Sequence, residues 1–348
     1  MNNVDYLIIG SGLAGILFAE VLTRQRKTFL MIDDASQRSS VVASGLYNPV
    51  ILKRFTGVWK AKEQLDIAMP MYECLENRLG IKLDHKISIK RLFNSIQEQN
   101  NWFLAADKPN LSKFLSHKII TNDNTSIKAD FGFGAVRHTG RIDTSLLVKA
   151  YRKELVEKGL FCDESFNYNL LDHQQDHLNY NNIKTKHIVF AEGFGLKKNP
   201  YFNHLPLNGT KGESIIIFAP DLKIDYVLKS SVFLIPIGND CYLVGATYEW
   251  EDKSNAITSK AESELISKLT KFINCDFDIV NQVAGIRPTV QDRRPLVGRH
   301  KIYENMYVLN GLGTRGVMIA PYVAQQLFDF IERKTVLNSE INSNRFEE

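Results

Sequence analysis

Three glycines near the start of the chain have the spacing of a phosphate-binding turn. Gly10, Gly12 and Gly15 form a G-x-G-x-x-G pattern that follows an apolar run at residues 6–9 and opens a helical stretch. In such turns the first glycine allows a tight bend, the second lets the backbone approach a pyrophosphate, and the third lets helix and strand pack closely. The helix N-terminus then faces the phosphates. We expect the whole turn to contact the cofactor, including Ser11, Leu13 and Ala14.

Two carboxylates follow at the distance that a ribose requires. A second apolar run, residues 29–32, ends at Asp33, which lies 18 residues after Gly15 and is followed by Asp34. An acid at about this spacing binds a ribose hydroxyl in dinucleotide-binding units. Strand, glycine turn, helix, strand and acid together predict a βαβ unit that holds a dinucleotide.

The bulk composition is that of a globular protein, large enough for one large domain or two of ordinary size. The chain has 348 residues, a net charge of +4 and four widely separated cysteines with no C-x-x-C pair. This spacing argues against a disulfide framework or a metal site and favours a reducing compartment. No apolar run reaches the ~18 residues of a membrane span. We therefore expect a cytoplasmic protein without a membrane partner.

Periodicity predicts the elements that must position these residues. The helices expected by their apolar spacing are residues 60–79, with a kink or break at Pro70 and an end at Gly80, and residues 144–158, 258–272 and 317–333. Buried strands are expected at 187–191 and 306–309, and three strand-like runs lie within 213–248. The last dozen residues are polar, and we expect them to be frayed.

The nucleotide-binding half is discontinuous along the chain. We assign residues 1–60, 140–212 and 285–348 to a Rossmann-like, α/β cofactor-binding domain. The β-rich stretches 61–139 and 213–284 would form an interleaved substrate domain with a mixed β-sheet.

Three further segments carry a family resemblance. The run AGIRPTVQDRRPLVG at 284–298 resembles a signature of the glycine oxidase and D-amino-acid oxidase superfamily of FAD enzymes. NGLGTRGVMIAP at 310–321 is similar to the C-terminal flavin-binding turn of that superfamily, and VASGLYNP at 42–49 to its second flavin loop. VGATYEW at 244–250 and the GTRG turn resemble the FAD domain of bifunctional tRNA enzymes that remove a carboxymethyl group from the wobble uridine.

The resemblance implies oxidation of a C–N bond next to a carboxylate. Hydride would pass to non-covalently bound FAD, water would hydrolyse the imine, and O2 would reoxidise the flavin. Arg287 stands where the family places its carboxylate-binding arginine, and a planar guanidinium can hold a carboxylate bidentately. The alternative is a structural arginine paired with an acid such as Asp292. Tyr248 falls at a position that faces the substrate in the family, unless it packs in the core.

The C-terminal turn would stabilise negative charge on the reduced flavin. Gly311, Gly313 and Gly316 expose backbone N–H groups just before a helix, whose N-terminus carries a positive potential. Arg315 adds charge there, reaches the substrate, or points to solvent. The full set of expected cofactor contacts is Gly10, Ser11, Gly12, Leu13, Ala14, Gly15, Asp33, Asp34, Ser44, Gly45, Gly193, Arg287, Gly311, Gly313, Thr314, Arg315, Gly316 and Val317. The expected catalytic residues are Arg287, Arg315 and Tyr248.

Two differences from the family pattern limit what the resemblance implies for the site residues. Glycine-oxidase relatives place a tyrosine where this chain has Phe233, and a phenyl ring cannot bond a carboxylate. The position of the oxygen-activating lysine of sarcosine-oxidase relatives aligns with Leu243. No cysteine matches their covalent flavin tether.

Three functions remain open at this stage. The first is oxidation of a free amine that carries a carboxymethyl or α-carboxylate group. The second is the same chemistry on tRNA, for which Lys53, Arg54, Arg293 and Arg294 would be RNA contacts rather than solvated charges. The third is a flavin-bound subunit with little activity of its own.

Overall fold

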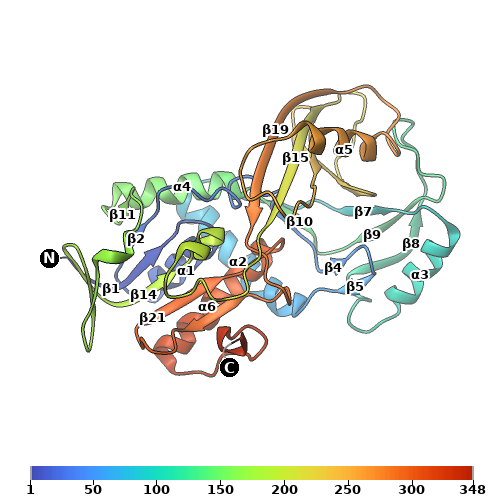
Figure 1. The fold of residues 1–348 in the computed structure, drawn as a ribbon. Coiled ribbons are helices and arrows are strands. Elements are labelled where there is room, and N and C mark those ends of the chain that lie inside the picture. The colour runs from blue at the N-terminus through green and yellow to red at the C-terminus, as the bar shows by residue number, and fades with distance from the viewer. Residues whose placement is uncertain (1, 347–348) are drawn as a thin grey trace.

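The computed structural model describes residues 2–346 and contains two large sheets (Figure 1). The first begins with the predicted βαβ unit: β1 (Asn2–Ile9), α1 (Leu13–Arg24) and β2 (Phe29–Ile32). β1 pairs in parallel with β2 on one side and with β14 (Ile183–Phe190) on the other. β14 pairs in parallel with β21 (Met306–Asn310), so strands from the two ends of the chain lie on either side of β14 in one sheet. This is the predicted Rossmann-like arrangement.

The remaining strands of this sheet extend its two edges. β11 (Phe161–Cys162) adds to β2, and β20 (Leu296–Arg299) runs antiparallel to β21. β12 (Leu171–His173) and β13 (Leu178–Tyr180) form a hairpin that pairs with the first half of β14. The sheet is therefore parallel from β11 through its centre to β21, and antiparallel where β20 and the β12–β13 hairpin are added.

Helices cover the first sheet and are built from the expected segments. α4 (Thr144–Glu157) and α6 (Gly316–Arg333) both contact α1, and α2 (Ala61–Leu79) packs on α6. The Tyr72 hydroxyl donates a hydrogen bond of 2.9 Å to the carbonyl of Val317 across the α2–α6 contact. α2 ends at Gly80, which has a φ of 65° as the sequence predicts. The helix continues through Pro70, so a break there is wrong; buried Ala68, Met71 and Tyr72 hold the two halves of the helix against the core.

The second sheet has eight strands and is mixed, as the sequence predicts. Its order is β19 (Asp278–Arg287), β15 (Thr210–Phe218), β18 (Cys241–Gly245), β17 (Phe233–Gly238), β16 (Val227–Lys229), β7 (Ile89–Leu92), β9 (Phe133–Val136) and β8 (Leu115–Ile120). Only the β16–β7 pair is parallel. α5 (Ser259–Leu269) packs against β15 and β18, and its buried Leu265 and Leu269 join the core on that face.

Short elements connect or flank the two sheets. A small sheet is formed by β3 (Leu46–Tyr47), β6 (Asp84–His85) and β10 (Gly140–Ile142), and a hairpin by β4 (Val50–Ile51) and β5 (Thr56–Gly57). α3 (Ile96–Ala106) packs on β8. β15 and β19 run across residues 212 and 284, where we placed domain boundaries; the division into domains stays a prediction.

The C-terminal segment is ordered where the structure describes it. Ile341 is fully buried, and Arg345 bonds Asp292 through its Nε at 2.7 Å. The expectation of fraying is therefore wrong for residues 338–346, because this polar sequence is fixed by buried Ile341 and by two ion pairs, Arg345 with Asp292 and Glu340 with Arg294. Residues 347 and 348 lie outside the described part of the chain.

Candidate functional site

The first glycine turn has the geometry that its sequence predicts. Gly10 has a φ of 105°, and a Cβ there would overlap the carbonyl oxygen of Ala191 at the end of β14. A Cβ on Gly15 would overlap the carbonyl oxygen of Gly10. Neither glycine can carry a side chain without moving the backbone. The turn is therefore locked between β14 and the first turn of α1.

One N–H group at the start of α1 is bonded by a side chain from outside the helix, and the helix has no cap of its own. Gly12 is the N-cap residue and has no side chain to cap the helix. The Leu13 N–H donates to the Oγ of Ser40 at 3.0 Å. The Oγ of Ser11, which is fully buried, has no hydrogen-bond partner within residues 2–346. An uncapped helix N-terminus beside an orphaned hydroxyl fits a pyrophosphate.

Asp33 closes this turn at the end of β2. Its carboxylate accepts hydrogen bonds from the Ser11 N–H at 2.5 Å and from Arg152 at 3.2 Å. The neighbouring Asp34 accepts a bond from the Ser165 hydroxyl instead. Asp33 is thus held at the turn, while Asp34 is directed towards the segment before β12.

Glu192 is a buried acid beside the same turn that sequence reasoning missed. It follows the end of β14, and its Cα would lie 3.2 Å from a Cβ on Gly10. It accepts bonds from the Tyr168 hydroxyl and from Asn199, the latter at 2.7 Å. Burial raises the pKa of Glu192 to about 7, although both hydrogen bonds lower it. With its pKa raised in this way, Glu192 carries less negative charge near neutral pH than an ordinary glutamate and repels a phosphate less.

The C-terminal turn lies beside the first one. Gly311 and Gly313 have φ values of 73° and 58°, and α6 begins at Gly316 without a side-chain cap. A Cβ on Gly316 would lie 3.3 Å from the Leu13 side chain, so the N-termini of α1 and α6 are in contact. A Cβ on Gly313 would meet no atom within 4 Å. Two helix N-termini and an open backbone turn therefore converge, which fits an extended, negatively charged cofactor.

The other expected cofactor contacts lie in the loops that follow β2 and β14 and at the start of α6. Asn310 donates to the carbonyl of Gly193 at 2.9 Å, which ties the end of β21 to the loop after β14. Gly45 has a φ of 72°, and its carbonyl accepts a bond from Ile142 in β10 at 2.9 Å. The Ser44 carbonyl accepts a bond from Arg141 at 3.1 Å. Thr314 is exposed and Val317 is buried at the start of α6.

Arg287 stands at the end of β19 without an acidic partner. Its Nη1 donates to the Thr247 carbonyl at 3.2 Å, and its guanidinium lies 4.8 Å from the centroid of the Tyr248 ring. Within residues 2–346 Arg287 forms no ion pair. Asp292, the acid that the sequence suggested as its partner, pairs with Arg345 instead. Burial lowers the pKa of Arg287. The alternative of a structural Arg287–Asp292 pair is therefore wrong.

Tyr248 and Arg315 belong to the same cluster. Tyr248 is 61% exposed, so the alternative of core packing is wrong for this residue. Arg315 is half-buried, and burial lowers its pKa, with Arg293 lowering it further and Tyr248 raising it. The alternative of an Arg315 side chain in open solvent is wrong as well. Within residues 2–346, Arg287 and Arg315 thus form no ion pair, and the exposed Tyr248 acts on both of them.

Strand register identifies the sheet face that carries this cluster. Thr210, Gly212 and Ser214 alternate along β15, and Gly212 lies under the guanidinium of Arg287. Ser214 is opposite Gly245, which is opposite Phe233. Because paired residues share a face of a sheet, these residues line one surface. The opposite face, with Ile215, Val244 and Leu234, packs against α5 and its core.

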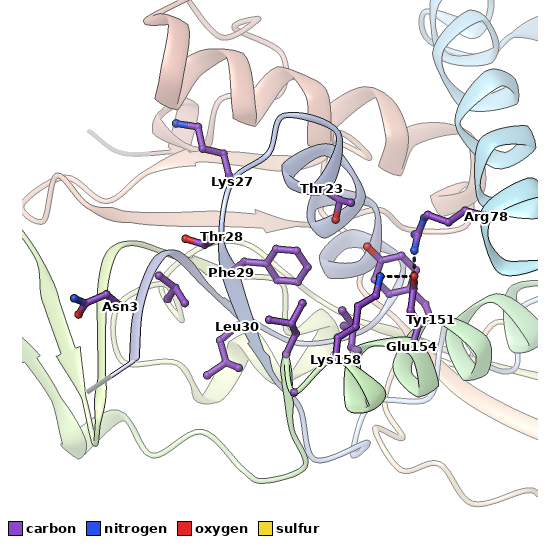
Figure 2. A pocket seen from close by; sticks show the side chains of 14 residues that line it. Asn3, Thr23, Lys27, Thr28, Phe29, Leu30, Arg78, Tyr151, Glu154 and Lys158 are labelled. Carbon is purple, nitrogen blue, oxygen red and sulfur yellow. Dashed lines mark hydrogen bonds and ion pairs between the residues drawn. The ribbon is translucent and has the colours of Figure 1, made fainter.

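A separate cavity of about 530 Å³ lies away from these residues (Figure 2). It is lined by the start of β2 and the ends of α1 and α4, which is the opposite end of the first sheet from Gly10. Arg78 and Lys158 both pair with Glu154 there, and Arg78 also pairs with Glu20. The charges that line this cavity compensate one another, and none of the expected site residues contributes to it.

Two kinds of site are not found in the described part of the chain. Between residues 2 and 346, no three His, Cys, Asp or Glu side chains are grouped so that they could hold a metal ion. Over the same residues, no helix combines the length and apolarity needed to cross a membrane.

Fold and turns together define a flavoprotein oxidoreductase built on a Rossmann-like sheet and a second, mixed sheet. The chain belongs to the FAD dependent oxidoreductase family, whose model matches residues 5–329. It is therefore an enzyme that uses FAD.

Two curated relatives span almost the whole chain. One is the glycine oxidase of Bacillus subtilis, 21% identical over 359 residues, which cover 96% of this chain and 95% of that protein. The other is the tRNA 5-methylaminomethyl-2-thiouridine biosynthesis bifunctional protein MnmC of Shewanella halifaxensis, 23% identical over 389 residues. That match covers 94% of this chain but only 59% of the bifunctional protein.

Solved structures share the fold over nearly their full length. The glycine oxidase of Geobacillus kaustophilus superposes with a TM-score of 0.80 at 16% identity and covers 97% of this chain and 96% of its own. The iminodiacetate oxidase of Chelativorans sp. BNC1 gives 0.79 at 16% identity, with 98% of each chain covered. At these identities the likeness establishes the fold alone.

Proposed function

We propose that this enzyme oxidises the C–N bond of an amine that bears a carboxymethyl or α-carboxylate group. The observation that carries the proposal is Arg287, a half-buried guanidinium without an acidic partner on the sheet face described above. Burying an unpaired cation is costly unless a ligand anion completes the site. A carboxylate is the anion whose planar shape matches a guanidinium.

In this proposal the chain's own residues bind and orient the amine. Arg287 fixes the carboxylate, and the Thr247 carbonyl and the Tyr248 ring fix Arg287. Holding the carboxylate in one place directs the adjacent carbon and nitrogen towards the flavin. Phe233 offers an apolar wall rather than a hydroxyl, so Arg287 carries the carboxylate with less help than the family pattern implies.

The cofactor would be held without a covalent bond by the two turns. FAD supplies the hydride acceptor when bound. The turn at Gly10 and the N-terminus of α1 would hold the pyrophosphate, with Asp33 at the ribose. The turn at Gly311 and the N-terminus of α6 would face the flavin ring, where a positive potential favours the reduced, anionic form. Reoxidation by O2 is part of the same proposal.

The test is anaerobic bleaching of the flavin absorbance of the purified protein. We would add sarcosine, glycine, D-amino acids and L-proline in turn, and then tRNA that carries carboxymethylaminomethyluridine. Bleaching by a carboxylate-bearing amine, lost in Arg287→Ala while the yellow colour remains, is the expected result. Unchanged kinetics in Arg287→Ala would overturn the role of this residue.

A tRNA substrate is the second candidate. Tyr248, whose ring lies beside Arg287, is 61% exposed, and Trp250, two residues further along the chain, is 51% exposed. Exposed aromatic rings next to cations are platforms for unstacked bases. The likeness to the bifunctional tRNA protein points the same way. Bleaching only by the modified tRNA would favour this candidate, and a protein that holds FAD but is bleached by neither class would favour a subunit with little activity alone.

A further inference from the structure

Lys229 faces the same side of the second sheet as the Arg287 cluster. It ends β16, where it is paired with Phe233 of β17. Phe233 is in turn opposite Gly245, whose other neighbour is Ser214 in β15. Since paired residues share a face, Lys229 lies in the row of side chains that includes Ser214.

Within residues 2–346, the ammonium group of Lys229 forms no ion pair. It lies 4.6 Å from the centroid of the Phe233 ring and 3.4 Å from the carbonyl oxygen of Ser231. It is half-buried, and the pKa of Lys229 is lowered to about 8 by burial and then by Arg91, Lys268 and Lys53. All three of the charged groups that act on it are cations.

Two of these cations are compensated and one is not. Arg91 pairs with Glu98, and Lys268 pairs with Glu264. Lys53, in the exposed loop between β4 and β5, forms no ion pair within residues 2–346. Positive potential therefore accumulates around Lys229 without an acid to balance it.

Lys90, on the opposite face of the same sheet, is a partly buried lysine with which Lys229 can be compared. Its Nζ lies 3.5 Å from the centroid of the Tyr226 ring, and burial lowers its pKa as well. Asp225 and Asp123, however, both act on Lys90 and raise its pKa. Lys90 has the carboxylates that Lys229 lacks.

We propose that Lys229 binds a second anionic group of the substrate, at the end remote from the carboxylate held by Arg287. This inference rests on the proposed function, and it makes the substrate a dianion: an amine with one carboxylate and a further carboxylate or phosphate. A lysine ammonium is a compact point charge that accepts either anion.

The sheet geometry sets the spacing of the two anions. The guanidinium lies over Gly212 in β15 and the ammonium over Phe233 in β17, with β18 between them. Two strand spacings and an offset of two residues put the two cations roughly 12 Å apart. A hydrogen bond of ~3 Å at each end leaves the anions roughly 6 Å apart, so a long dicarboxylate should fit better than a short one.

The experiment measures binding of non-reacting carboxylates by the perturbation of the visible flavin spectrum in the FAD-loaded protein. The ligands are acetate, malonate, glutarate and adipate, and the variants are Lys229→Met, Lys229→Arg and the matched control Lys90→Met. We expect adipate to bind the unmodified protein roughly tenfold more tightly than acetate, since a charge-assisted hydrogen bond contributes about 1.5 kcal/mol or more. Lys229→Met should lose this advantage without changing the Kd of acetate, Lys229→Arg should keep it, and Lys90→Met should change neither.

Two arms distinguish the sources of the second anion. Carboxymethylaminomethyluridine and its 3′-monophosphate are compared as ligands. If the monophosphate binds more tightly than the nucleoside, and this gain in affinity depends on Lys229, the site is assigned to an RNA phosphate. If only adipate shows a Lys229-dependent gain in affinity, the site is assigned to a small dicarboxylate. Equal loss of acetate and adipate binding in Lys229→Met, or no gain for either dianion, overturns the inference. If acetate itself fails to perturb the flavin, and Arg287→Ala changes nothing, the proposed function fails instead.

Discussion

The guanidinium of Arg287 lies directly over the backbone of Gly212. The two residues are on neighbouring strands, and a Cβ built on Gly212 would overlap Nη1, Nη2 and Cζ of Arg287. Gly212 therefore provides the space in which the arginine side chain lies. Its backbone conformation is ordinary, so this need for space, and not backbone strain, is what requires glycine at this position.

Gly212→Ala should displace Arg287 and weaken substrate binding. The methyl group occupies the volume of the guanidinium, so the bidentate contact with a carboxylate is lost or rebuilt at a worse angle. We expect kcat/KM to fall roughly 10- to 100-fold, from about 1.5–3 kcal/mol for hydrogen bonds to a charged group. Steady-state kinetics and flavin content together make the measurement.

The double variant Gly212→Ala/Arg287→Ala tests whether the effect passes through Arg287. In that background the new methyl group has no guanidinium to displace, so kcat/KM should equal that of Arg287→Ala alone. A further loss in the double variant would show that Gly212 acts by another route.

Tyr248 should contribute through its ring rather than its hydroxyl. The ring faces the Arg287 guanidinium, and no hydrogen bond to its hydroxyl is formed within residues 2–346. Tyr248→Phe should therefore leave KM unchanged, while Tyr248→Ala should raise KM roughly 2- to 5-fold, from about 0.5–1 kcal/mol for an exposed cation–π contact. A large loss in Tyr248→Phe would instead assign the hydroxyl to the substrate.

Glu192 should make stability depend on pH in the neutral range. Its pKa is raised from 4.5 to about 7, so the folded protein binds more protons than the unfolded chain between these values. The free energy of unfolding should therefore fall as pH rises from 4.5 through about 7, and then level off. Thermal unfolding from pH 4.5 to 8 measures this dependence.

Glu192→Gln is the matched control for that titration. A glutamine is neutral, like the protonated acid, and its amide oxygen can accept from Asn199; the Tyr168 hydroxyl, which donates to Glu192 in the structure, can instead accept from the amide NH2 group. Its Tm should lose the part of the pH dependence that Glu192 causes. An identical pH profile in Glu192→Gln would mean that another group titrates.

Lys211 should be required for stability at the start of β15. It is fully buried and pairs with Asp252 at 2.5 Å and with Glu213 at 3.5 Å. Lys211→Met leaves the buried Glu213 without its cation, and we expect a loss of about 3–5 kcal/mol in the free energy of unfolding. Lys62→Met, which breaks an exposed pair with Asp66, should cost less than about 1 kcal/mol. Equal urea midpoints for the two variants would contradict this difference.

The cofactor half of the molecule could be predicted from the sequence because its signals are local. Gly10, Gly12 and Gly15 stand within six residues of one another, and the structure gives them the turn that their spacing predicts. The turn before α6 has the same character, with Gly311 and Gly313 in the left-handed region. In both turns the backbone conformation requires glycine, and the glycines are visible directly in the sequence.

The substrate face could be predicted only in part, because it depends on pairing between distant strands. Arg287 was identified by its motif. Gly212 lies on another strand, and only the strand register shows that it makes room for the Arg287 side chain. Lys229 belongs to no motif. That its charged neighbours, such as Arg91 and Lys53, are cations becomes visible only in the folded chain. Ser40 and Glu192 were missed as well; a serine pair before the second flavin loop was the one available signal for Ser40.

The cofactor site joins parts of the chain that are made at very different times. The N-terminus of α1 touches that of α6 through Leu13 and Gly316. The second turn emerges from the ribosome roughly 300 residues after the first, which at 5–20 residues per second is on the order of 15–60 s. Throughout that interval the nascent chain holds half a site, so FAD can be captured only once the turn at Gly311 has been synthesised and released. Ribosome-bound chains stalled before and after this turn should differ accordingly in FAD retention, and cellular flavin supply would act on this protein only after the turn at Gly311 has emerged.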